Sequence, residues 1–449
     1  MPISPSIKRN LSLAWPLAIN ALLMQSMLMI DTLLISPLGE MSLAAMGIAS
    51  TIVAFFLGIQ MALANGTQLV ISRAVGCGRA SALANAFWPG LAINTLISGL
   101  FWLCIVLFEH SMVRVLTTSN ALHNEVSSYL SIAKYLIIFT ALTQVLTALF
   151  NGLGKTKIPL KGYLIEMPIN AVMSYFLIHG YLDVEGFGLQ GAAIGSLISI
   201  LIRLAYLSLV FFLDKHIHLP KQTDWGKQVF AHFSEIFPVA VNVIILSIGA
   251  TIYQLLYSQL SIHSYAAITI IMPWLRSGSQ FITAWAHSSA ITLSQAIGAG
   301  KQTNLKKNVS TSINIAIVIS LFTSLLFLFL SSIVQRLYPD MDPSTYTALA
   351  IIAPLYIFLP IIRGYNTVHG HILRALGKTT SVFKINFIGQ WAISIPLCAL
   401  LILHFDCSIF WAFAVQPIEE IIKAYPFRHL AKQSLDNFDH SVFKRYSGD

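Results

Sequence analysis

The chain has 449 residues, of which 56% are hydrophobic and only 10% are charged, and its mean hydropathy is +0.73. Soluble domains carry roughly 25% charged residues, so this composition excludes a soluble globular protein and places most of the chain in a membrane. Within hydrocarbon, backbone polar groups must be satisfied inside helices or closed barrels. The apolar runs here are continuous and about 20 residues or longer, which is typical of membrane helices and not of barrel strands.

The first ten residues carry Lys8 and Arg9, and they are followed by an apolar run far longer than the core of a signal peptide. We therefore expect a first span here and no cleavable signal. The four cysteines have neither metal-ligand spacing nor a compact disulfide pattern. Hydropathy predicts twelve spans, at about 11–36, 43–71, 84–108, 126–149, 160–180, 189–213, 230–258, 266–291, 307–333, 345–372, 383–404 and 407–427.

The basic residues are distributed unevenly between the predicted loops. Most of the Lys and Arg residues precede span 1, follow an even-numbered span or lie near the C-terminus, whereas the opposite loops carry mainly Asp and Glu. This is the positive-inside pattern, and it predicts that both termini are cytoplasmic. The net charge of +9 then reflects topology, so we do not expect nucleic-acid binding.

Three segments of the first half recur in the second half at a nearly constant offset. The pairs are Trp15–Asn20 with Phe237–Asn242, Ser72–Arg79 with Ser294–Lys301, and Leu153–Thr156 with Leu376–Thr379. Each repeat holds six spans, an even number, so both repeats insert in the same orientation. Parallel repeats of this kind are common in secondary transporters, although a duplicated channel or scaffold remains an alternative.

The predicted fold class is therefore an all-α membrane protein of about twelve transmembrane helices in two pseudo-symmetric six-helix bundles. Pro16 and Pro238 lie at matching places in spans 1 and 7. Because proline removes a helix hydrogen bond, each is either a fixed kink or part of a moving, gating helix. The predicted domains are an N-terminal lobe, a cytoplasmic linker, a C-terminal lobe and a cytoplasmic tail, at 1–214, 215–229, 230–428 and 429–449.

These motifs together resemble the multidrug and toxic compound extrusion (MATE) family. The resemblance rests on the early proline of span 1, Asp31-Thr32 followed by Gly39, a Gly-x-Gly after span 2, the repeated Leu-Gly-Lys-Thr, and the stretch Gly186–Ser196. It implies two six-helix lobes around a central cavity and export of organic cations and hydrophobic drugs, driven by Na+ or H+ and without ATP. The chain contains no Gly-x-x-x-x-Gly-Lys-[Ser/Thr] phosphate loop, which agrees with that expectation.

Asp31 is the clearest candidate for coupling to a cation. An acid deep in a span costs about 2.5–3.5 kcal/mol to insert, so it is a functional candidate by default, although it could instead be hydrogen-bonded for structural reasons. Its carboxylate could take a proton or Na+, and the resemblance makes it the main coupling residue of the first lobe.

Other candidates for the same site lie in spans 5 and 6. Glu166, Asn170 and Ser174 are spaced by four residues and share one helix face. The resemblance implies that Asn170, Ser196 and the backbone around Ala192 join the site, whereas Ser174 stands where some members carry a second aspartate. Glu166 could supply a second acid or could simply reach water near the membrane edge.

The second half lacks equivalent acids, so we expect no cation site there. Arg276 and Arg363 lie inside spans 8 and 10. They are either cavity cations, which would favour anionic or zwitterionic cargo, or partners in internal ion pairs. Four further residues are predicted to line the substrate cavity: Gln25, Gln144, Asn242 and Tyr253, the last being the counterpart of Asp31.

The leading hypothesis is an antiporter that exports small amphipathic compounds in exchange for H+ or Na+, with no cofactor and no metal beyond Na+ at Asp31. A flippase or exporter of lipid-linked precursors or anionic metabolites is the runner-up. A membrane enzyme with His369 or His371 as its base would need clustered nucleophile and base positions, and the duplication gives no reason for such a site. We expect small-molecule substrates, a bacterial inner membrane and a monomer.

Overall fold

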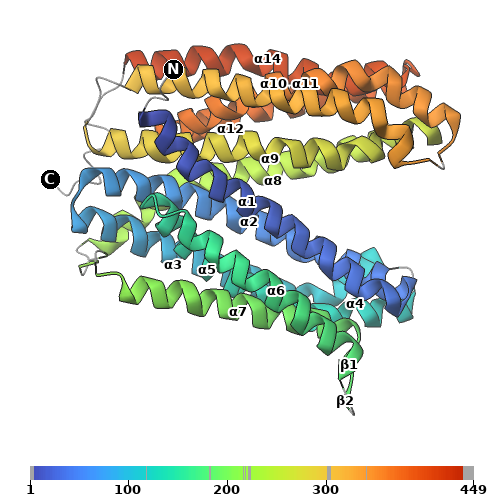
Figure 1. Ribbon diagram of the computed structural model, residues 1–449, viewed down its shortest axis with the longest axis horizontal. Coiled ribbons are helices and arrows are strands. Elements are labelled where there is room, and N and C mark those ends of the chain that lie inside the picture. The colour runs from blue at the N-terminus through green and yellow to red at the C-terminus, as the bar shows by residue number, and fades with distance from the viewer. Residues whose placement is uncertain are drawn as a thin grey trace. The chain divides into compact units, whose positions relative to one another are not determined.

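The computed structural model describes residues 5–117, 119–181, 184–215, 217, 219–220, 224–300, 305–339 and 341–437. Nearly all of these residues are helical (Figure 1). The elements of the first half are α1 (Pro5–Ile35), the 3-10 turn η1 (Ser36–Leu38), α2 (Glu40–Cys77), α3 (Ala80–Leu116), α4 (Asn120–Ala133), α5 (Leu136–Gly152), α6 (Lys157–His179), β1 (Gly180–Tyr181), β2 (Val184–Glu185) and α7 (Leu189–Leu213).

The second half repeats this order without the strands. Its elements are α8 (Trp225–Tyr257), α9 (Ile262–Gly298), α10 (Leu305–Leu337), α11 (Pro343–Ala375), α12 (Thr379–Phe387), the π-helical segment η2 (Ile388–Ser394), α13 (Ile395–Leu403) and α14 (Ile409–Asp436). The segments α12, η2 and α13 follow one another without a gap and together form one span.

The twelve predicted spans are confirmed as helices within the described part of the chain, and the all-helical fold class is correct. Span 4 is divided into α4 and α5, which are separated only by Lys134 and Tyr135. Nine of the described helical segments are long and apolar enough to cross a membrane. The helices α6, α9 and α14 have spanning length but are more polar. Polar residues in a span are costly in lipid, so these three helices are where chemistry is expected.

The described residues divide into two compact units by their contacts. One unit holds the residues before Ile19 together with those from Val241 onward, and the other holds Ile19–Ala240. The divisions fall just after Pro16 and Pro238, at equivalent points of the two repeats. Both prolines lie inside continuous helices. Whether they act as kinks or gates stays a prediction.

Close packing in the first half depends on small residues between α6 and α7, which lie side by side in Figure 1. A Cβ atom added at Gly195 would lie 2.4 Å from Ser174 Oγ, and one added at Gly191 would lie 2.3 Å from the carbonyl oxygen of Leu177. Only glycine allows the two backbones to approach so closely, as is common between membrane helices. This contact brings the polar face of α6 against α7.

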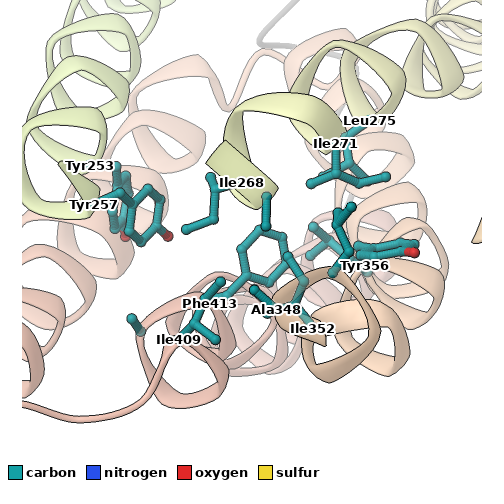
Figure 2. Packing of buried hydrophobic residues seen from close by; sticks show 14 of the residues in the cluster. Tyr253, Tyr257, Ile268, Ile271, Leu275, Ala348, Ile352, Tyr356, Ile409 and Phe413 are labelled. Atoms are coloured by element: carbon teal, nitrogen blue, oxygen red, sulfur yellow. The ribbon is translucent and has the colours of Figure 1, made fainter. Parts of the chain in front are cut away.

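The core of the second half is formed by α8, α9, α10, α11, α13 and α14, and Figure 2 shows part of it. Figure 2 shows Tyr253 and Tyr257 side by side on α8, and their rings stack with centroids 6.0 Å apart. Phe413 from α14 is fully buried in the same cluster. Helix α11 packs along α9, α10 and α14, so residues on α11 can reach side chains on each of these helices.

Candidate functional site

Three helices of the first half bring Asp31, Asn170 and Ser196 together. Asn170 on α6 donates a hydrogen bond from Nδ2 to Ser196 Oγ on α7, at 3.0 Å. The Ser196 side chain also lies within hydrogen-bonding reach of the Asp31 carboxyl group on α1. Asp31 is half-buried, whereas Asn170 is almost fully buried. The serine hydroxyl thus connects the amide and the acid.

Two oxygen atoms of this cluster, and the hydroxyl of Ser174 one turn further along α6 from Asn170, lack a hydrogen-bond partner among the described residues. They are Asp31 Oδ1, Asn170 Oδ1 and Ser174 Oγ, and all three are buried. A buried polar atom without a partner costs free energy, so these atoms are able to accept a ligand, a water molecule or a proton. Oxygen atoms are the ligands that hard cations prefer. With one carboxylate and neutral oxygens, the group suits a proton or a monovalent cation.

Two further residues define the surroundings of this cluster. Ala192 lies on α7 one turn before Ser196, is almost fully buried and belongs to the hydrophobic core of the first half. Tyr129 on α4 interacts electrostatically with Asp31, and its hydroxyl lies within hydrogen-bonding reach of Ser50. Sequence reasoning missed Tyr129, because a tyrosine in an apolar span gives no signal of its position relative to α1.

Glu166 has a different partner. Its Oε2 accepts a 2.6 Å hydrogen bond from Nη1 of Arg203, and both side chains are only 4% exposed. Arg203 also donates to Thr143 Oγ1 at 2.9 Å and lies over the ring of Tyr163, 4.2 Å from its centroid. The structure therefore places the acid of Glu166 in an ion pair between α6 and α7.

The predicted cavity residue Gln144 lies beside this ion pair. Its Nε2 donates to the Tyr163 hydroxyl at 3.3 Å, and the side chain is buried. By contrast, Gln25 on α1 is exposed. The sequence placed both residues in one cavity, and the structure connects only Gln144 with a buried polar network.

A cavity of about 520 Å³ lies within the second half and is lined by residues of α8, α9, α11, α12, η2 and α14. Tyr253, Arg276 and Arg363 line it, and their role in binding substrate stays a prediction. Asn242 is nearly buried and accepts a 2.9 Å hydrogen bond from Asn386, which lines the cavity. Three of the four second-half candidates thus border this cavity directly.

Part of the cavity wall is a network of charged residues on α14. Lys423 Nζ lies 2.8 Å from Glu419 Oε1 and 3.1 Å from Glu420 Oε1. Arg363 on α11 lies 3.6 Å from Glu420 and donates to Gln416 at 3.2 Å. Arg363 is therefore both a cavity residue and an ion-pair partner, so the two alternatives for this residue coexist.

Neutral residues complete the network. The Tyr253 hydroxyl donates to Glu419 Oε2 at 3.0 Å, and Asn366 Nδ2 donates to Glu420 Oε2 at 2.7 Å. The spacing of Glu419, Glu420 and Lys423 at three and four residues could have signalled pairing on one helix face. Their partners on α8 and α11 are remote in sequence and could not be predicted in this way.

The two histidines considered for an enzyme site each contact a backbone carbonyl or another ring. His369 Nδ1 lies 2.8 Å from the carbonyl oxygen of Tyr365, and the His371 ring lies 4.4 Å from that of His287. Among the described residues, no group of three or more His, Cys, Asp or Glu side chains could hold a metal ion. The polar sites within this bundle thus offer ion-binding oxygens and a charged cavity.

A bundle of this kind, with two repeated halves and ionisable residues inside spans, defines a polytopic membrane transporter. The MatE family model matches residues 16–176 and 238–400, once in each repeat. The chain belongs to the MatE family, whose members are transporters and not enzymes. The predicted family resemblance is therefore confirmed, and the membrane-enzyme hypothesis is excluded.

Individual relatives agree with this assignment. The chain is 24% identical to the uncharacterized transporter YisQ of Bacillus subtilis, over 88% of this chain and 87% of YisQ. It is 21% identical to the multidrug resistance protein NorM of Burkholderia vietnamiensis, over 89% of each protein. The crystal structure of a variant of the Vibrio cholerae MATE transporter VcmN superposes with a TM-score of 0.86, at 18% identity and over 97% of this chain and 98% of that one.

Proposed function

We propose that the protein is a secondary active efflux transporter that exchanges small amphipathic compounds for H+ or Na+ by alternating access. The observation that carries the proposal is the Asp31 cluster, a single carboxylate among buried oxygens that lack hydrogen-bond partners. Membership of the MatE family supports transport, and the name of the relative NorM supports multidrug efflux.

The chemistry of the cluster determines which ions are suitable. When a proton or Na+ binds at Asp31, it neutralises a charge that is costly inside a membrane. Asn170 Oδ1 and Ser174 Oγ can each supply an oxygen ligand or accept a hydrogen bond. Release of the ion restores the charge. The ion-bound and ion-free forms of Asp31 therefore differ in energy, and this difference can be coupled to a conformational change.

Membrane placement and assembly are part of the same proposal. The positive-inside pattern favours cytoplasmic termini, and the bacterial relatives favour a bacterial inner membrane. We further propose that the protein acts as a monomer, without cofactors or nucleic acid. Pro16 and Pro238 would then lie in the helices that change between the states.

The test compares dye export by wild type and Asp31→Asn in proteoliposomes with an imposed Na+ gradient, an imposed pH gradient, or neither. We expect Asp31→Asn to lose gradient-driven export, and Glu185→Gln, an exposed acid on β2, to keep it. Dependence on one gradient identifies the ion. Export by Asp31→Asn at the wild-type rate would show that Asp31 is not the coupling residue.

A further inference from the structure

Six charged residues line the cavity of the second half, and four of them are cations. They are Arg276, Arg363, Arg374, Lys423, Glu419 and Glu420. A cavity for cationic cargo would be expected to carry an excess of acids, because opposite charge attracts a ligand and like charge rejects it. The balance here is the reverse.

The two acids of the cavity are already neutralised. Glu419 and Glu420 share Lys423, at 2.8 and 3.1 Å, and Arg363 approaches Glu420 at 3.6 Å. Two acids and two bases leave no net charge in this network. Hydrogen bonds from Tyr253 and Asn366 occupy further carboxylate oxygens. A cationic ligand would have to break these contacts before it could use either acid.

The remaining two cations, Arg276 on α9 and Arg374 on α11, pair with no acid among the residues that the structure describes. Arg276 is exposed and Arg374 is half-buried. Charges interact more strongly in a cavity partly shielded from water than they do in bulk solvent. Guanidinium groups also match carboxylate, sulfonate and phosphate oxygens in geometry.

The rest of the lining suits an aromatic or aliphatic body. Tyr257, Tyr265 and Met272 line the same cavity, and its volume of about 520 Å³ lies within the usual range for sites of drug-sized ligands. We infer that this cavity binds amphipathic organic anions, which the unpaired charges of Arg276 and Arg374 attract. The inference rests on the proposed efflux function and specifies its cargo class.

The experiment measures equilibrium binding to the purified full-length protein in lipid nanodiscs, without any ion gradient. Two probes with the same ring system but opposite charge, the anion fluorescein and the cation rhodamine 123, are titrated by fluorescence anisotropy, and empty nanodiscs give the lipid background. The variants are Arg276→Gln/Arg374→Gln, the charge-conserving Arg276→Lys/Arg374→Lys, and Arg336→Gln, which removes an exposed arginine at the end of α10.

We expect wild type and Arg336→Gln to bind fluorescein more tightly than rhodamine 123. Charge-assisted contacts predict that the double glutamine variant loses about tenfold or more in affinity for fluorescein, whereas the double lysine variant keeps most of it. Tighter binding of rhodamine 123 to wild type, no saturable binding of fluorescein, or unchanged affinity in the glutamine variant would overturn the inference. A melting curve like that of wild type excludes misfolding of the variants.

The outcome of this experiment is independent of the coupling mechanism. Binding is measured at equilibrium, so Asp31→Asn is expected to bind fluorescein even if it cannot export. If gradient-driven export fails while fluorescein binds through the arginines, only the proposed function is wrong. If the protein exports cationic dyes and binds no fluorescein, only the cargo class is wrong.

Discussion

Removal of the Glu166 charge should destabilise the first half of the protein strongly. Glu166 and Arg203 are each 4% exposed and form an ion pair at 2.6 Å between α6 and α7. In Glu166→Gln the guanidinium stays buried and loses its counter-charge, so that its remaining partners, Thr143, the Tyr163 ring and the introduced amide oxygen, are all neutral. Breaking a buried pair from one side typically costs about 3–5 kcal/mol, because it leaves an uncompensated buried charge.

Removal of both charges should be less harmful than removal of one. The variant Glu166→Leu/Arg203→Met leaves no unpaired charge, and replacement of a whole buried pair by well-packed hydrophobic residues of similar volume is often nearly neutral. The assay is thermal unfolding in detergent, followed by tryptophan fluorescence. The control is Asp436→Asn, which breaks the exposed pair with Lys306 and should leave the melting temperature unchanged.

The order of melting temperatures decides whether this reasoning is correct. We expect wild type and the control to melt highest, the double variant below them, and Glu166→Gln lowest. A single variant as stable as the control would refute the argument that burial gives this pair its importance. A double variant less stable than Glu166→Gln would show that the pair stabilises the fold by more than mutual neutralisation.

Two smaller perturbations test local packing and capping. Gly195→Ala should lower the melting temperature, because the new Cβ would meet Ser174 and overpacking costs about 1–3 kcal/mol. The matched control is Gly58→Ala, since no atom lies within 4 Å of a Cβ added at Gly58. Equal melting temperatures for the two variants would contradict the close approach of α6 and α7. The Asp342 side chain caps α11 by accepting from the Ser344 amide at 2.8 Å, and this backbone hydrogen bond lowers the pKa of the Asp342 carboxyl. The stabilisation by this cap is thus fully present above the ordinary Asp pKa of about 3.9 and is lost as pH falls through the lower pKa of the folded protein. At neutral pH, Asp342→Ala should therefore raise the rate of amide hydrogen exchange in the first turn of α11. An unchanged rate would argue against the cap.

The spans could be predicted from the sequence because lipid imposes a local rule on every 20-residue segment. Two departures inside the spans could not. The break at Lys134 and Tyr135 between α4 and α5 interrupts a continuous hydropathy signal, with Lys134 paired to Glu109 at 2.9 Å. The π-helical turn Ile388–Ser394 carries Trp391, which donates to the carbonyl oxygen of Ile245 on another helix. Both features depend on neighbours that hydropathy does not contain.

The candidate cation site was accessible to sequence reasoning for a different reason. Asp31 stands out because an acid inside a span is rare, and the family resemblance supplied Asn170 and Ser196. Glu166 shows where this reasoning ends, since its spacing from Asn170 fits a shared face while its ion-pair partner is Arg203 on α7. Helix periodicity predicts which residues share a face of a helix. The side chains that this face contacts depend on tertiary packing, which periodicity does not predict.

The two repeats therefore differ in how the charges inside their spans are compensated. At Asp31 a single charge has neutral oxygen neighbours, so uptake or loss of one cation changes the local charge completely. The equivalent position in the second half is Tyr253, whose hydroxyl donates to Glu419 in a network that already sums to zero. Loss of Glu419 would leave Lys423 and Arg363 to share Glu420, with one net positive charge in the network, whereas loss of Asp31 would leave only neutral groups. A duplicated scaffold can thus hold a single isolated charge in one copy and a compensated set in the other, an asymmetry that is compatible with the proposed antiport.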